Sequence, residues 1–272
     1  MKESKSEKIR RILHSKPLTE RNDLFIFIDN KKEFICSAGT SFIGIIQEYL
    51  KKWGNLYLGL VALLGPVKPS RMFISLQKKM LKKHRENDII LSIGSGPHTY
   101  MGREDIINCD LFDFPNVDIV CDAYSLTIKD SSVDYIINIA MLEHSKEPEK
   151  IISEMLRVCN DSGEIFCFVP FVSPFHAAPD DYYRWTKNGA RELFKDFKEV
   201  EIGIGAGPTS GALWVLQEWL SLVLSFGNRT IKDIIFLILM IFTFPIKYLD
   251  IIFEKYPNAD KLASGFYIHA KK

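Results

Sequence analysis

Apolar residues change their spacing along the chain near Asp88. Before this point they recur every three or four positions, as on one face of a helix, most clearly in residues 71–85. Residues 24–28 are an exception, since five successive apolar residues favour a short strand. We therefore predict a helical N-terminal extension over residues 1–85.

From residue 88 onward, short apolar runs alternate with turn residues. The runs are mostly apolar on both sides, which is typical of parallel strands covered on both faces. A helical pattern over residues 149–159 lies between two of them, and another over 189–194 follows. The pattern predicts an α/β fold with a Rossmann-like, seven-stranded, mostly parallel sheet. The predicted strands are residues 89–93, 106–109, 117–121, 133–139, 165–169, 200–204 and 266–270.

Two of the predicted connections are short. Twelve residues separate Ile93 from Ile106, and seven separate Asp110 from Asp118. A parallel crossover normally needs about a dozen residues or more, usually with a helix. Part of one sheet face is therefore expected to lack its helices, and we predict that helices from residues 42–85 cover it.

An apolar helical insert, residues 207–262, separates the sixth strand from the seventh. Its most apolar helix, residues 234–246, would span about 20 Å, less than the ~30 Å hydrocarbon core of a bilayer. Two interpretations remain: a buried helical hairpin that roofs the substrate site, or peripheral membrane contact through residues 213–253. Trp214, Trp219 and Lys247 suit a membrane interface, which slightly favours membrane contact.

Charge and cysteine usage restrict the partners. The formal net charge is +1, which gives no overall field for nucleic acid, so no nucleic-acid partner is expected. The basic start of the chain is expected to be a solvated or frayed end.

The five cysteines form no C-x-x-C pair, so we expect no metal site and buried thiols in a reducing compartment. No signal peptide is recognised, which favours the cytoplasm, with contact on the inner face of the membrane if the insert binds lipid.

Polar and glycine residues follow four of the predicted strands. A glycine-containing turn at residues 94–96 follows the first strand, Asp110 the second and Asp122 the third. Residues 141–144 follow the fourth. Glycines let a ligand approach the backbone, and a carboxylate accepts hydrogen bonds from a ribose diol. Since open parallel sheets bind ligands beyond the carboxyl ends of their strands, these groups are expected to converge on one nucleoside.

With these residues the sequence resembles the class I S-adenosylmethionine-dependent methyltransferases of the type 11 group. The likeness covers residues 88–205 and 264–271 and is strongest in residues 118–169. It implies a methyltransferase domain over residues 86–272, S-adenosyl-L-methionine as cofactor, and a last strand inserted antiparallel between the fifth and sixth. Ser92 stands where the family has an acid, and His98 where it has a third glycine.

The resemblance also implies roles for individual residues. The glycine turn would pass under the methionyl part of the cofactor, Asp110 would bind the ribose, and Asp122 the adenine amino group. Residues 140–142 would lie near the sulfonium. The implied cofactor-binding residues are Gly94, Ser95, Gly96, Asp110, Asp122, Ala123, Ala140 and Leu142.

The segment 170–186 mixes aromatic residues with a few polar ones, as substrate sites require. A hydroxyl or amine acceptor would need its proton removed, which His176 or His144 could do. Arg184 is interpreted as an ion-pair partner and Thr186 as a helix cap. The expected catalytic residues are His176, His144 and Asp181, and the expected substrate residues are Phe175, Tyr182 and Arg184.

The favoured function is transfer of a methyl group to a small or lipid-linked acceptor. A non-catalytic protein that binds S-adenosylmethionine, or a membrane-attached scaffold, is the alternative. A nicotinamide dehydrogenase fits less well, because its third glycine is absent.

Overall fold

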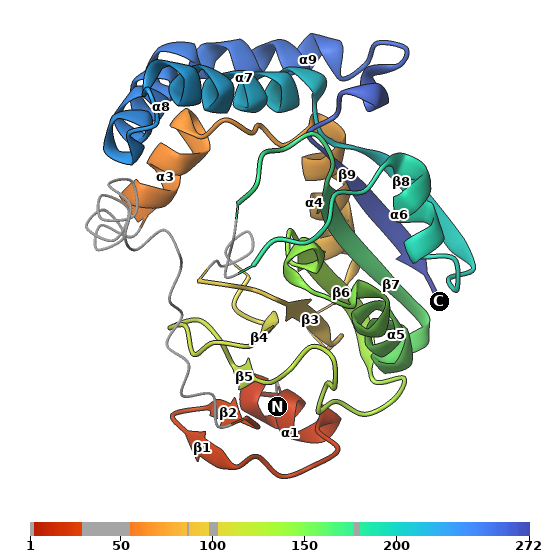
Figure 1. The fold of residues 1–272 in the computed structure, drawn as a ribbon. Helices are drawn as coiled ribbons and strands as arrows, with labels where there is room; N and C mark the ends of the chain where they lie inside the picture. Colours follow the sequence, from red (N-terminus) through yellow and green to blue (C-terminus); the bar gives the residue numbers. More distant parts are fainter. Residues whose placement is uncertain (1–2, 29–54, 86, 98–102, 177–179) are drawn as a thin grey trace.

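The computed structural model describes residues 3–28, 55–85, 87–97, 103–176 and 180–272, and within them nine strands form one sheet (Figure 1). The strand order across the sheet is β1-β2-β5-β4-β3-β6-β7-β9-β8. The strands are β1 (Thr19–Arg21), β2 (Leu24–Ile26), β3 (Ile90–Ile93), β4 (Ile107–Asp110), β5 (Ile119–Val120), β6 (Val133–Ile139), β7 (Cys159–Pro170), β8 (Glu199–Ala206) and β9 (Gly265–Lys271).

The expected α/β architecture is confirmed. Strands β2 to β7 pair in parallel, and β9 lies antiparallel between β7 and β8. The sheet has nine strands rather than the expected seven, because the N-terminal hairpin β1–β2 adds to its edge. Fully buried Phe25 of β2 joins the core there, which explains why the apolar run at residues 24–28 pairs with β5.

The basic start of the chain is not a frayed end. It forms α1 (Lys5–Ile12), which begins with a capping box between Ser4 and Glu7. Ile9 and Ile12 on the inner face of this helix are buried in the main core. Arg10 and Arg11 are exposed on the other side, whereas Lys8 is buried and its Nζ donates to the Asp88 carbonyl, so the helix is amphipathic rather than simply basic.

Helices cover both faces of the sheet (Figure 1). The helices α1, α5 (Pro148–Val158) and α6 (Lys187–Leu193) share one apolar core with one face. On the other face, α4 (Arg71–Lys83) packs Phe73, Met80 and Leu81 against strand residues including Tyr135 and Phe166. The prediction that helices of residues 42–85 cover a bare face is confirmed for α4, whereas residues 42–54 lie outside the described part of the chain.

The apolar insert forms a helical hairpin beyond the sheet (Figure 1). It consists of α7 (Pro208–Leu224), α8 (Arg229–Thr243), η3 (Phe244–Leu249) and α9 (Asp250–Phe253), and η4 (Ala259–Lys261) follows. Fully buried Asp250 fixes the hairpin, because its carboxylate accepts hydrogen bonds from the backbone N–H groups of Thr209 and Ser210 at the start of α7. Buried Lys247 donates to two carbonyl groups at the end of α3 (Asn55–Leu64).

The helical stretch Arg229–Phe253 is 25 residues long with a mean hydropathy of 2.1, and only 11% of its most apolar window is buried. By length and composition it is the one stretch of the described residues that could cross a membrane. The expectation that its helix is too short is wrong, because the chain continues past Pro245 in a 3₁₀ turn and would reach about 37 Å.

We predict that Phe73→Ala lowers the free energy of unfolding by about 3 kcal/mol, because it leaves a cavity between α4 and the sheet. Met72→Ala on the same helix is the control, since Met72 is 59% exposed and should change stability by less than about 0.5 kcal/mol. Urea unfolding followed by circular dichroism measures both. Equal losses for the two variants would show that α4 does not cover this face in solution.

Candidate functional site

The glycine turn after β3 is bonded to the end of β4. The backbone N–H of Gly94 donates to the carbonyl of Cys109 at 2.9 Å, and that of Gly96 donates to Asp110 Oδ2 at 2.8 Å. Asn116 adds a bond from its Nδ2 to the Gly96 carbonyl at 3.2 Å. The turn and the first predicted ribose-binding carboxylate therefore form one unit.

Gly94 also lies against the end of β6. Its φ is +67°, and a Cβ atom there would lie 2.4 Å from Cγ of Met141. Only glycine fits this position without displacing Met141. Ala140, which directly precedes Met141, has a positive φ of 51°. This conformation is strained for a non-glycine residue, and such strain is often found at functional sites.

The two aspartates lie at the same edge of the sheet as the glycine turn. Asp110 ends β4, and Asp122 follows the adjacent parallel strand β5. Burial raises the pKa of Asp110, and hydrogen bonds from the backbone N–H groups of Phe112 and Gly96 partly offset this rise. Asp122 accepts a bond from the Tyr124 N–H at 2.9 Å, which fixes the turn that follows β5. The glycine turn, Asp110 and Asp122 therefore share one edge of the sheet, while their convergence on a nucleoside stays a prediction.

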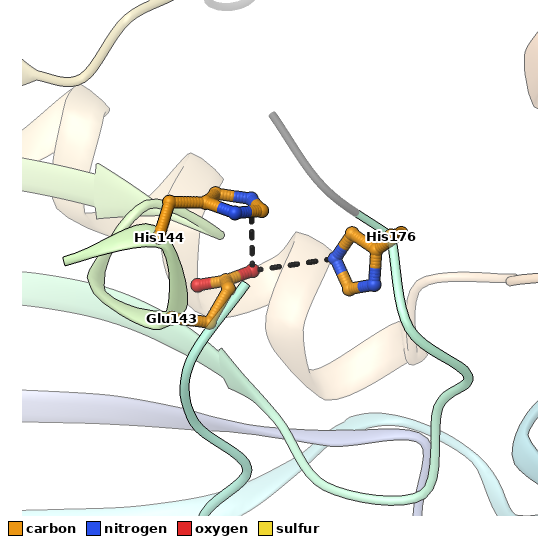
Figure 2. A group of neighbouring side chains, drawn as sticks. All are labelled: Glu143, His144 and His176. Carbon is orange, nitrogen blue, oxygen red and sulfur yellow. Dashed lines mark ion pairs between the residues drawn. The ribbon is translucent and has the colours of Figure 1, made fainter. Parts of the chain in front are cut away.

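A second cluster lies just beyond β6. The 3₁₀ helix η2 (Leu142–His144) places Glu143 and His144 side by side, and His176 approaches from the segment after β7 (Figure 2). Glu143 is fully buried, and its Oε1 lies 3.8 Å from Nε2 of His144 and 3.7 Å from Nε2 of His176. Sequence segments more than thirty residues apart thus meet around one carboxylate.

Arg184 and Asp181 hold the segment that carries His176. Asp181 accepts bonds from Arg184 Nη2 at 2.6 Å and from the backbone N–H of His176 at 2.8 Å. Burial acts to raise the pKa of Asp181, but the bonds from Arg184 and His176 outweigh it, so this pKa lies below its usual value. Asp181 is therefore ionised at neutral pH, and its carboxylate holds the backbone of His176 in position. The predicted cap is confirmed, because Thr186 accepts the Gly189 N–H at the start of α6.

The helical insert reaches the same cluster. The rings of Trp214 in α7 and His176 lie 5.4 Å apart between centroids. His144 and His176 are also in ring contact, at 5.4 Å and a right angle. The insert therefore contacts the cluster, but it is not the buried hairpin of the first interpretation, because only 11% of its most apolar window is buried.

The remaining predicted site residues lie less centrally. Phe175 and Tyr182 are 74% and 41% exposed, so their side chains point largely to solvent. Leu142 is fully buried in the main core, and Ser95 is buried beside the glycine turn. Ala123 is packed against the same core. His98 lies outside the described residues.

The sequence analysis assigned no role in the site to Glu143, Met141 or Trp214, although the first two lie in its segment 141–144. A role for Glu143 could have been inferred, because an acid beside His144 after a strand end is a signal of acid–base or metal chemistry. Met141 and Trp214 gave no such signal, since an apolar residue in sequence does not reveal which backbone or ring it contacts.

Burial by itself lowers the pKa of His176, but the Glu143 carboxylate and the Pro174 carbonyl outweigh burial and raise this pKa above its usual value. We predict that Glu143→Gln lowers the pKa of His176, as measured by NMR titration of the imidazole in metal-free buffer. Because the pKa of His176 is raised in the folded protein, protonation of His176 stabilises the fold. This stabilisation is fully present below the pKa of the unfolded state, about 6.5, and is lost as the pH rises through the pKa of the folded state.

Glu147→Gln is the control, because Glu147 is an exposed carboxylate in the same part of the chain and pairs with Lys150. It should leave the His176 titration unchanged. An unchanged titration in Glu143→Gln as well would contradict the assigned cause of the shift.

A comparison with protein families identifies a known domain in the chain. Residues 102–167 match the family model described as a methyltransferase domain. A search of curated proteins finds no match.

Several solved structures are similar at low identity. Phosphoethanolamine N-methyltransferase 2 of Haemonchus contortus, solved with S-adenosyl-L-methionine, is 15% identical, with a TM-score of 0.49 over 83% of this chain and 59% of that one. This chain thus spans less than two thirds of that enzyme's length. A methyltransferase from Thermotoga maritima, described as a possible histamine N-methyltransferase, is 12% identical, with a TM-score of 0.47 over 83% and 99% of the two chains.

The domain match covers β4, β5, β6 and most of β7, and Asp110, Asp122 and Glu143 lie at or after the ends of the first three of these strands. The antiparallel strand β9 lies between β7 and β8, as the sequence resemblance implied. The match to a methyltransferase domain and the place of β9 thus agree with the fold of the class I S-adenosylmethionine-dependent methyltransferases that the sequence resembles.

Proposed function

We propose that this protein transfers a methyl group from S-adenosyl-L-methionine to a small or lipid-linked acceptor. The observation that carries the proposal is the hydrogen bond between the glycine turn and Asp110, at the same sheet edge as Glu143 and His176. It joins a nucleoside-binding arrangement to a cluster that can act on an acceptor. The match of residues 102–167 to a methyltransferase domain supports it.

The residues at the strand ends fit the cofactor. The Asp110 carboxylate accepts the backbone N–H groups of Gly96 and Phe112, and a carboxylate, with about four lone-pair sites, can still accept a ribose hydroxyl. Gly94 and Gly96, both with positive φ, leave the backbone open to a close ligand. Asp122 lies one strand further along the edge, where the adenine amino group would be bound.

The acceptor would be bound on the His176 side of the site. S-adenosylmethionine supplies a methyl group already activated by a sulfonium, so the protein mainly aligns the two reactants. A neutral hydroxyl or amine must also lose a proton. His176 and His144 are the groups that can take it, while Asp181 and Arg184 fix the position of His176.

We predict that Gly94→Ala weakens binding of S-adenosylmethionine at least about tenfold in isothermal titration calorimetry, since the new methyl group displaces Met141 into the cofactor position. Gly227→Ala is the matched control. Gly227 also has a positive φ, 83°, but no atom lies within 4 Å of the added Cβ. It should lower stability without changing affinity for the cofactor.

Wild-type protein that releases no heat with S-adenosylmethionine would contradict the proposal. Binding without transfer of a radiolabelled methyl group to a cell lipid extract would favour the non-catalytic alternative. Ser92 supports that alternative, because its buried hydroxyl has no hydrogen-bond partner among the described residues where the family has an acid.

The lipid part of the proposal rests on the outer face of the insert. Apolar side chains are exposed along both helices of the hairpin and at its tip, where Phe226 is 96% exposed. An apolar surface of this kind marks a protein or membrane interface. The exposed apolar residues of the hairpin include Val215, Leu216, Trp219, Leu222, Val223, Leu224, Phe226, Ile231, Ile234, Ile238, Ile241 and Phe242.

Contact from one side of the membrane fits the hairpin better than a crossing. Both ends of the insert return to the same sheet, at β8 and β9, so one crossing would separate two bonded strands. The Lys232–Glu218 ion pair between the two helices is also more stable at an interface than in hydrocarbon. We therefore place the protein on the inner face of a cytoplasmic membrane, with Trp214 linking the lipid-facing hairpin to His176.

We predict that the double substitution Phe226→Glu and Phe242→Glu lowers co-sedimentation with vesicles of phosphatidylcholine and phosphatidylglycerol by about tenfold, because it places charge on the apolar face. Leu18→Glu with Met72→Glu is the control. Both residues are more than half exposed but lie outside the hairpin. Equal vesicle binding by the two double variants would remove the membrane assignment and leave methyl transfer untouched.

A further inference from the structure

We propose that Glu143, His144 and His176 bind a divalent transition-metal ion. One nitrogen of each histidine and one carboxylate oxygen lie within 4.8 Å of one another (Figure 2). The expectation of no metal site rested on the spacing of the cysteines, whereas this cluster consists of two histidines and a carboxylate. Two imidazoles with one carboxylate are a common ligand set for zinc and for iron(II) in proteins.

The hydrogen bonds of both histidines leave Nε2 free to face Glu143. Nδ1 of His144 lies 2.6 Å from the backbone carbonyl of Asp180, and Nδ1 of His176 lies 3.0 Å from that of Pro174. Because a carbonyl oxygen can only accept, each Nδ1 must carry the hydrogen. Metal-bound histidines are fixed in the same way, by donating from their second nitrogen to a carbonyl or carboxylate.

Arg184 does not change this assignment. Its Nη2 also lies 3.1 Å from Nδ1 of His176, but it has only two hydrogens. Shorter contacts, at 2.7 Å to the Pro174 carbonyl and 2.6 Å to Asp181, use both of them. Nδ1 of His176 is therefore a donor, and its Nε2 carries a lone pair in the neutral ring.

Glu143 gives the second, independent indication. Its side chain is fully buried, and neither carboxylate oxygen has a hydrogen-bond partner among the residues that the structure describes. A buried carboxylate without hydrogen bonds is costly unless a positive charge compensates it. Two nitrogen lone pairs that point at the same oxygen increase the cost, and a cation between the three atoms removes it.

The geometry fits a transition metal once the three ligand atoms, which lie within 4.8 Å of one another, draw closer. Bonds of about 2.1 Å bring neighbouring ligand atoms to roughly 3 Å from one another. The present Nε2–Oε1 distances of 3.7 and 3.8 Å therefore have to shorten by less than about 1 Å. Two imidazole ligands disfavour Mg²⁺ and Ca²⁺, which prefer oxygen.

Three protein ligands leave at least one coordination position for the acceptor. If the proposed methyl transfer is correct, this position suits an acceptor hydroxyl. With both histidines acting as ligands rather than as proton acceptors, a bound cation would lower the pKa of that hydroxyl, so that its proton passes to water and the oxygen remains as the nucleophile. Met141, which touches Gly94, directly precedes η2, so the metal lies close to the proposed cofactor position.

Titration of the untagged full-length protein with Mn²⁺, followed by electron paramagnetic resonance, tests the site. We expect one Mn²⁺ per chain, and binding at least about tenfold weaker in Glu143→Gln and in His176→Gln. His14→Gln is the control, because His14 is an exposed histidine remote in sequence from the cluster, and it should bind Mn²⁺ as the wild type does. Circular dichroism verifies that each variant is folded.

Absence of Mn²⁺ and Zn²⁺ binding by the wild type would overturn the proposal and leave a proton as the compensating charge. Unchanged binding in both folded cluster variants would overturn it too, since the ion would then lie elsewhere. Calorimetry with S-adenosylmethionine on the same samples separates the two proposals. If the protein binds the cofactor but no metal, only the proposed metal site is wrong. If it binds metal but not the cofactor, only the proposed methyltransferase activity is wrong.

Discussion

Parallel pairing of β5, β4, β3 and β6 is the constraint on which the site depends. These strands carry their polar residues at or just after their carboxyl ends, and parallel pairing brings all four ends to one edge. The bond from the Gly96 N–H to Asp110 and the contact of Gly94 with Met141 are direct consequences. A slip of one residue in this pairing would turn every one of these side chains to the other face.

The N-terminal segment makes this sheet stable despite its short connections. Residues 94–97 and 103–106, the described part of the connection between β3 and β4, contain no helix. The missing cover is supplied by α4 on one face and α1 on the other, from parts of the chain that precede the sheet. The start of α4 is in turn bound to the far edge, because Ser70 donates its hydroxyl to the Ile204 carbonyl of β8. The extension is thus part of the domain core.

The helical insert has two different faces. Its inner face contains buried polar anchors, Asp250 and Lys247, which fix α7 and the end of α3. Its outer face is apolar and exposed. Trp214 connects the hairpin to His176, so an acceptor held at a lipid surface would be near the chemistry that we propose. Buried polar bonds of this kind hold the hairpin in one orientation, which packing of apolar helices alone would not do.

The sequence by itself determined the class of fold, the strands from residue 89 onward and the residues at their ends, because strand length, apolar runs and glycine turns are local properties. It also identified His144, His176, Asp181, Arg184 and the Thr186 cap. It could not show that residues 19–26 extend the sheet, that α8 continues past Pro245, or that Trp214 lies on His176. Above all, only the tertiary structure decided that Glu143 is buried between two histidines, because the partners of a buried charge come from chain segments whose approach depends on the packing of the whole domain.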